Sequence, residues 1–358
     1  MKKERLARVI AGMEKRGLEQ IVVSAPASVF YLTGTWIAPG ERMLALYITA
    51  DGSATLYANR LFALSGSVDV PLVEFDDTDD PIALLQKDVR PGKLGVDKLW
   101  PSQFTIRLMD ARPDVRPTLG SKPVDDARMR KGADELEKMR ISSRMNDEVS
   151  RRVLENLKEG MTETEVAAMY LSIAKELGAS GPSFEPLVCF GANCAEPHHA
   201  SDETRLKKGD SVILDVGLVW QDYCSDMTRT VFFGEATEEQ RKVYELVERA
   251  NAAGRNAVKP GMPMKMFDKA AREVIEEAGY GEYFIHRTGH GIGLEVHEPP
   301  DNSSTNETIA QPGMTFSVEP GVYLPGRFGV RVEDLVAVTE TGVETLNQLT
   351  KEFRIIAG

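Results

Sequence analysis

The spacing of hydrophobic positions in the first third of the chain switches between helical and strand-like periods. One face of an amphipathic helix predicted over residues 2–17 carries the apolar residues Leu6, Val9, Ile10 and Met13. Helical windows are also expected at 81–88 and 102–111. Short apolar runs predict strands at Gln20–Ser24, Met43–Thr49, Ala54–Ala58, Val70–Phe75 and Leu94–Val96. This alternation indicates a small α/β domain ending near residue 128.

The rest of the chain has longer elements in a different order. Helical spacing predicts helices at 134–158, 163–177, 237–257 and 264–278. The strands predicted between and after them are Leu187–Phe190, Val212–Leu218, Arg229–Phe233, Met314–Val318 and Gly329–Val338. Strands grouped with long helices, without strict βαβ alternation, indicate an α+β layer arrangement. Because 358 residues exceed one typical core, two domains are predicted, 1–128 and 129–358.

Composition and charge narrow the class of protein. A hydrophobic content of 42% and a charged content of 27% are ordinary for a globular protein. The formal net charge of −12 argues against nucleic acid or an anionic membrane as partner. Three cysteines are too few, and odd in number, for a disulfide framework, and the charged N-terminal stretch does not fit a secretion signal. A cytoplasmic protein without a membrane span is therefore expected.

Four carboxylates and one imidazole stand in short motifs within or beside apolar, strand-like runs. They are Asp215 in ILDVG, Asp226 in SDMTRT, His290 in GHGIG, Glu319 in VEPG and Glu333 in RVED. Unpaired charge in such surroundings is costly, and four clustered carboxylates would repel one another until some were protonated. Two divalent cations would cancel the four negative charges. The sequence therefore predicts a site for two metal ions.

Two predicted hairpins can bring these ligands together. Asp215 and Asp226 flank a turn at 221–223, and a hairpin of this size places both carboxylates on one face of a sheet. Glu319 and Glu333 repeat the arrangement about a second turn. An oxygen-rich set with one imidazole suits Mn²⁺, Co²⁺ or Zn²⁺ and argues against a thiolate zinc site. Two such ions can activate a water molecule and polarise a carbonyl oxygen, which is hydrolytic chemistry.

The other histidines fit supporting roles. His198, His286 and His297 can orient a carbonyl group or relay a proton near neutral pH. His199 competes with its neighbour His198 for such a role, and a core histidine is the minor alternative for His286. Arg331 has a similar alternative, as a strand residue with a surface partner.

These motifs resemble those of the proline-specific pita-bread metallopeptidases, prolidase and aminopeptidase P. The resemblance rests on PHHAS, ILDVG, YCSDMTRT, HRTGHGIGLEVHE, FSVEPG and VRVED, which cover roughly residues 133–358. A weaker likeness joins SVFYLTG to the smaller N-terminal domain of that family. The fold implied is α+β, a pita-bread (creatinase/aminopeptidase) catalytic domain at 129–358 preceded by a smaller α/β creatinase-type domain at 1–128.

The same resemblance implies a set of metal ligands. Asp215 would chelate one ion, and His290 with Glu319 the other. Asp226 and Glu333 would bridge the two ions. Each subunit would thus hold two divalent metals, Mn, Co or Zn.

Roles in the reaction also follow from the resemblance. His297 would stabilise the tetrahedral oxyanion, and His198 would contact the substrate carbonyl or its amide. Glu319 would handle the proton of the attacking water. His286 would line the proline pocket, and Arg331 would pair with carboxylates around the metals.

The predicted activity is hydrolysis of the peptide bond preceding proline, with an Xaa-Pro dipeptidase (prolidase) as the leading hypothesis. An Xaa-Pro aminopeptidase acting on longer peptides is the close alternative, and a non-catalytic binding module on the same scaffold is the remote one. Because proline lacks an N–H and its ring fixes φ, an apolar pocket that uses Phe184 would supply the selectivity. Proline-containing di- or oligopeptides are the expected partners. A homodimer is also expected. The loop with Trp36 would then reach over a neighbouring subunit's cleft, and an ordinary core tryptophan is the equal alternative.

Overall fold

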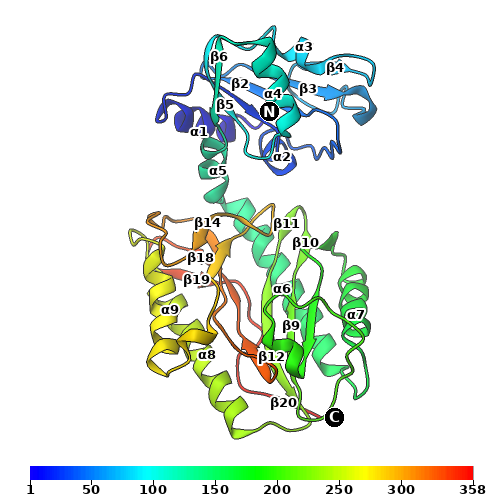
Figure 1. The fold of residues 1–358 in the computed structure, drawn as a ribbon, viewed down its shortest axis with the longest axis vertical. Coiled ribbons are helices and arrows are strands. Elements are labelled where there is room, and N and C mark those ends of the chain that lie inside the picture. Colours follow the sequence, from blue (N-terminus) through cyan, green and yellow to red (C-terminus); the bar gives the residue numbers. More distant parts are fainter. Residues whose placement is uncertain (358) are drawn as a thin grey trace. The chain divides into compact units, whose positions relative to one another are not determined.

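The computed structural model describes residues 1–357, which form two compact units (Figure 1). The first unit is Met1–Arg128, and the second begins at Met129. Both units combine helices with β-sheets. No helix of residues 1–357 is both long and apolar enough to cross a membrane.

A six-stranded mixed sheet forms the centre of the first unit, in the order β4-β3-β2-β1-β5-β6. Its strands are β1 (Gln20–Val23), β2 (Ala45–Thr49), β3 (Ala54–Asn59), β4 (Leu72–Phe75), β5 (Gly92–Val96) and β6 (Val115–Leu119). The helices are α1 (Lys3–Glu14), α2 (Pro26–Thr33), α3 (Pro81–Leu85) and α4 (Ser102–Ala111), after which the chain passes through α5 (Lys122–Met129). Of these elements, α2, α5 and β6 were not predicted.

The second unit contains two pairs of helices, and each helix begins and ends close to the predicted residues. They are α6 (Ala133–Glu155) with α7 (Glu163–Glu176), and α8 (Glu238–Ala257) with α9 (Lys265–Glu277). Capping boxes fix the starts of α7 and α8, where Thr162 caps Glu165 and Thr237 caps Gln240. Figure 1 shows α7 and α9 on opposite sides of this unit, with strands between them.

Four small sheets fill the space between the helix pairs. Their strand orders are β20-β12-β9-β8, β14-β13-β15-β18-β19, β11-β10-β7 and β16-β17. The strands are β7 (Gly181–Pro182), β8 (Leu187–Phe190), β9 (Ser211–Val216), β10 (Leu218–Trp220), β11 (Tyr223–Cys224), β12 (Met227–Phe233), β13 (Gly289–Gly291), β14 (Glu298–Asn302), β15 (Thr315–Val318), β16 (Gly321–Leu324), β17 (Phe328–Arg331), β18 (Asp334–Val338), β19 (Val343–Thr345) and β20 (Ile355–Ile356).

Two predicted strands are wrong in their length, because each is split. The run 212–218 divides into β9 and β10, and the run 329–338 divides into β17 and β18. At each split the backbone changes its partner. β9 pairs with β12 but β10 pairs with β11, and β17 pairs with β16 but β18 pairs with β15. An apolar run shows no sign of such a change, so periodicity alone joined the two pieces.

Candidate active site

The hairpin formed by β9 and β12 carries two of the predicted ligands. Asp215 in β9 lies opposite Thr228 in β12, and Asp226 directly precedes β12. One further step along this register sets Asp226 opposite Gly217. Residues two apart on a strand share a face, so Asp215 and Asp226 lie on the same face of the hairpin. The hairpin arrangement expected from the sequence is therefore present.

A second antiparallel pair carries the two glutamates. Val318 of β15 lies opposite Asp334 of β18. Glu319 directly follows β15 and Glu333 directly precedes β18, so the next step of the register sets these glutamates opposite each other. Both strands end at the ligand positions, where the chain leaves the sheet.

His290 reaches the same region from the middle of β13, the neighbour of β15. A Cβ on Gly289 would lie 1.9 Å from the carbonyl oxygen of Ser317, so only glycine allows the two strands to approach this closely. The hydroxyl of Ser317 accepts a hydrogen bond from His290 N at 3.0 Å and donates one to Glu319 Oε1 at 3.0 Å. Ser317 thus fixes the strand of His290 relative to the carboxylate of Glu319.

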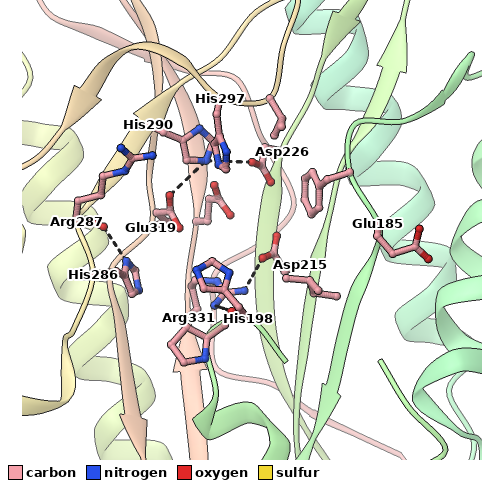
Figure 2. A pocket seen from close by; sticks show the side chains of 15 residues that line it. Glu185, His198, Asp215, Asp226, His286, Arg287, His290, His297, Glu319 and Arg331 are labelled. Carbon is pink, nitrogen blue, oxygen red and sulfur yellow. Dashed lines mark hydrogen bonds and ion pairs between the residues drawn. The ribbon is translucent and has the colours of Figure 1, made fainter. Parts of the chain in front are cut away.

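The ligand atoms of these strands converge on one point. Asp226, His290 and Glu333 each offer one atom, and these atoms lie within 4.8 Å of one another. His290 Nε2 is 3.4 Å from Asp226 Oδ2 and 3.4 Å from Glu319 Oε1 (Figure 2). Asp226 Oδ1 and Glu333 Oε1 are buried without a hydrogen-bond partner among residues 1–357. Buried carboxylate oxygens without partners call for a compensating group, and a divalent cation fits this donor set.

The protein alone provides unfavourable electrostatics for this cluster. Burial, followed by the neighbouring carboxylates, raises the pKa of Asp226 and of Glu333 well above the usual range. Burial also raises the pKa of Asp215. Burial acts to raise the pKa of Glu319 too, but nearby histidines and Arg331 outweigh it and lower that pKa. Bound cations would favour the ionised form of all four groups.

A chain of hydrogen bonds connects Asp215 to His286. Arg331 pairs with Asp215 through Nη2 and donates from Nη1 to the hydroxyl of Tyr323 at 3.0 Å. Since this hydroxyl accepts from Arg331, its own hydrogen is free to be donated to His286 Nε2 at 2.8 Å. His286 Nδ1 then donates to the carbonyl oxygen of Arg287 at 2.7 Å. Burial lowers the pKa of His286, which favours the neutral ring, and the carbonyl oxygen at Nδ1 selects this tautomer.

The candidate ligands, together with Arg331 and His286, line one cavity of about 560 Å³ (Figure 2). Every candidate residue from the sequence lines it: Phe184, His198, Asp215, Asp226, His286, His290, His297, Glu319, Arg331 and Glu333. The other lining residues are Glu185, Leu187, Pro197, Arg287 and Val296. His199, the competitor of His198, is not among them.

His297 lies beside His290, one of the candidate metal ligands. Its ring stands edge-on to that of His290, with 4.1 Å between the ring centroids. Burial, and then the neighbouring His290 and Arg287, lower the pKa of His297 to about 4. His297 is therefore a neutral imidazole at pH 7, with one N–H to donate.

Sequence reasoning missed three hydroxyl groups that support the site. They are those of Ser317, Tyr323 and Thr228, the last of which donates to Glu333 Oε2 at 2.7 Å and accepts from Arg331 Nε at 3.1 Å. Each lies in a buried strand among apolar residues. The sequence signal that could have identified them is a hydroxyl residue within an apolar run, close to one of the ligand motifs.

Two family models match the chain. The Creatinase/Prolidase N-terminal domain matches residues 5–130, and Metallopeptidase family M24 matches residues 137–340. A relative from Staphylococcus aureus, described as an uncharacterized peptidase, is 34% identical over 97% of this chain and 99% of its own length.

Solved structures resemble the chain over its whole length. The prolidase from Thermococcus sibiricus is 35% identical with a TM-score of 0.94, covering 100% of this chain and 99% of that one. Dipeptidase PepE from Mycobacterium ulcerans is 35% identical with a TM-score of 0.94, covering 99% and 98%. X-Pro aminopeptidase from Thermotoga maritima is 29% identical with a TM-score of 0.82, covering 96% and 100%. The pita-bread fold with a creatinase-type first domain, predicted from the sequence, is thereby confirmed.

Proposed function

The chain belongs to metallopeptidase family M24, and from this we propose that it is an Xaa-Pro dipeptidase, which hydrolyses the peptide bond preceding proline. One observation carries the proposal. Asp226 and Glu333 each present a buried oxygen without a hydrogen-bond partner among residues 1–357, in a cavity that also holds His198 and His297. The likeness to a prolidase and to a dipeptidase over the whole chain supports the substrate class.

Two divalent cations are part of the proposal. Asp215 would hold one ion and His290 with Glu319 the other, while Asp226 and Glu333 would be shared. When bound, the ions would lower the pKa of a water molecule and polarise the scissile carbonyl. Manganese as the native metal, a homodimer and a cytoplasmic location rest on the resemblance and on composition alone.

The side chains of the cavity would orient the peptide and move its protons. His297, neutral because burial lowers its pKa to about 4, can donate its N–H to the oxyanion that develops on the scissile carbonyl. His198 would hold the substrate carbonyl or amide. Glu319, with a lowered pKa, can accept the proton of the attacking water. His286 already uses Nε2 to accept from Tyr323, so it would act as a wall of the pocket and not as a donor.

Selectivity for proline would come from the apolar part of the cavity. Three apolar side chains line the cavity, those of Phe184, Leu187 and Val296. A pyrrolidine ring can be buried against them without leaving a polar group unsatisfied. A residue with a free N–H after the scissile bond would leave that donor without a partner on such a wall.

An Xaa-Pro aminopeptidase is the second candidate, and the likeness to the X-Pro aminopeptidase from Thermotoga maritima over 96% of this chain favours it. The two candidates differ in whether the cavity accepts a chain that continues after proline. A dipeptidase would exclude that chain, whereas an aminopeptidase would bind it.

The proposal can be tested by measuring the hydrolysis of Ala-Pro and Ala-Pro-Ala-Ala, with Ala-Ala as control. Each peptide is assayed with protein stripped of metal by a chelator and with the same protein after metal is restored. We expect Ala-Pro alone to be cleaved, and only after manganese or cobalt is restored. Comparable kcat/KM for the tetrapeptide would favour the aminopeptidase. No cleavage of any peptide by protein with stoichiometric metal would contradict a peptidase function and favour the binding module.

A further inference from the structure

A half-buried histidine, His199, and the fully buried Glu163 form a pair that has no part in the proposed reaction. The chain has five histidines, and four of them line the cavity. The fifth, His199, directly follows His198 but points to Glu163, whose Oε2 lies 3.0 Å from His199 Nε2. The exposed fractions of the two side chains are 15% and 0%. A fully buried carboxylate that holds the neighbour of a catalytic candidate needs an explanation.

Glu163 binds the segment that carries His198 on both sides of that residue. Its four hydrogen-bond donors are Phe190 N at 2.7 Å, Asn193 Nδ2 at 3.0 Å, His199 Nε2 at 3.0 Å and Asp202 N at 3.0 Å. Two donors precede the turn at Pro197–His198, and two follow it. These four bonds use the acceptor capacity of the carboxylate, which argues against a metal site at Glu163, His199 and Asp202.

A side chain that lines the cavity, that of Arg331, binds the opposite side of the same turn. Arg331 Nη1 donates to the carbonyl oxygen of Pro197 at 3.2 Å, while Nη2 of the same side chain pairs with Asp215. His198 therefore lies between two anchors, the Glu163 carboxylate behind it and the Arg331 guanidinium in front. Because His198 and His199 are consecutive, fixing one imidazole on Glu163 restricts the direction of the other.

We propose that Glu163 and His199 are positioning residues that hold the His198 imidazole in place for the reaction. The proposal rests on the peptidase function and on the contact of His198 with substrate. A displacement of about 1 Å in a group that orients substrate can cost on the order of 100-fold in rate. His199 would thus act through its neighbour and would touch neither substrate nor metal.

A double-mutant cycle separates positioning from general stabilisation. We expect His199→Ala to lower kcat about tenfold for the peptide that the protein cleaves, with metal content and melting temperature near those of the wild type. In a His198→Ala background the same substitution should have no further effect, because there is no imidazole left to position. His199→Gln, which keeps an N–H donor toward Glu163, should recover most of the loss.

Glu196→Gln is the matched control. It removes a carboxylate that lies 3.9 Å from His199 Nδ1 and is 78% exposed, and it should leave kcat unchanged. If the losses of His199→Ala and His198→Ala multiply in the double variant, the positioning role is wrong. It is also wrong if His199→Ala has the wild-type kcat.

A second measurement does not depend on turnover. In metal-free protein with ¹⁵N-labelled histidine, His199→Ala should shift or broaden the ring signals of His198 and leave those of His286, His290 and His297 in place. Unchanged His198 signals would overturn the positioning role. Absence of Xaa-Pro hydrolysis with shifted His198 signals would overturn the proposed function alone.

Discussion

Replacing Asp226 by asparagine should stabilise the metal-free protein and abolish its response to metal. Asp226 is buried, and its Oδ1 has no hydrogen-bond partner among residues 1–357. Burial, and then the charges of Asp215 and Glu319, raise its pKa, so the ionised carboxylate is less stable in the folded protein than in the unfolded chain. A neutral amide of the same shape removes this penalty. With cations bound, the effect reverses because an anionic ligand is lost.

The size of the effect follows from the cost of leaving a buried charge uncompensated. That cost is about 1–3 kcal/mol. It does not rise further because Asp226 can take up a proton and become neutral. A domain of 150–250 residues shifts its melting temperature by about 2–4 °C per kcal/mol, so Asp226→Asn should melt roughly 2–12 °C higher than the wild type at neutral pH.

The dependence on pH has a definite sign. The pKa of Asp226 is higher in the folded than in the unfolded state, so folding takes up a proton. The metal-free wild type should therefore lose stability as the pH rises from about 4, the usual carboxyl pKa, to neutral. The advantage of the asparagine variant should shrink as the pH falls toward about 4.

Thermal unfolding of protein treated with a chelator, at pH 5 and 7.5 and with or without added manganese, measures the effect of the substitution and its dependence on pH. Glu340→Gln, at an exposed position, is the control and should melt close to the wild type. The reasoning fails if chelated Asp226→Asn melts below the wild type at pH 7.5. It fails equally if the variant keeps the increase in melting temperature that metal gives the wild type.

Three further substitutions test the surroundings of the site. Tyr323→Phe removes the hydroxyl between Arg331 and His286 and should lower kcat/KM roughly 5- to 10-fold, with little change in melting temperature, by steady-state kinetics. Gly289→Ala places a Cβ 1.9 Å from a backbone oxygen and should lower the bound metal per subunit, measured by elemental analysis; full occupancy would contradict this. Lys131→Met removes the ammonium that lies 2.7 Å from the buried carboxylate of Glu298. It should cost about 3–5 kcal/mol in denaturant unfolding, and a loss below about 1 kcal/mol would refute the estimate.

Local signals account for the part of the fold that the sequence predicted. The helices of the second unit begin where a threonine is followed three residues later by Glu165 or Gln240, and both capping boxes are present. The strands beside the ligands are continuous apolar runs because both of their faces are covered. Short-range patterns of this kind need no knowledge of the partner strand.

The predicted strand lengths failed where a backbone changes its partner. The run that continues from β17 into β18 leaves the pairing with β16 and joins β15, and Glu333 lies at this junction. The break places the carboxylate of Glu333 next to Thr228 of yet another strand. Apolar spacing is the same on both sides of the break, so the sequence could not reveal it.

By itself the sequence predicted a candidate ligand set and a class of chemistry, because four acids and an imidazole in apolar runs call for a compensating charge. The tertiary structure alone decided which neighbouring side chains act with them. His198 faces the cavity while His199 binds Glu163, which lies 36 residues away along the chain, and Arg331 reaches Asp215 across 116 residues. Hydrogen-bond partners that distant are chosen by the packing of the sheets, and neighbouring residues of one motif do not encode them.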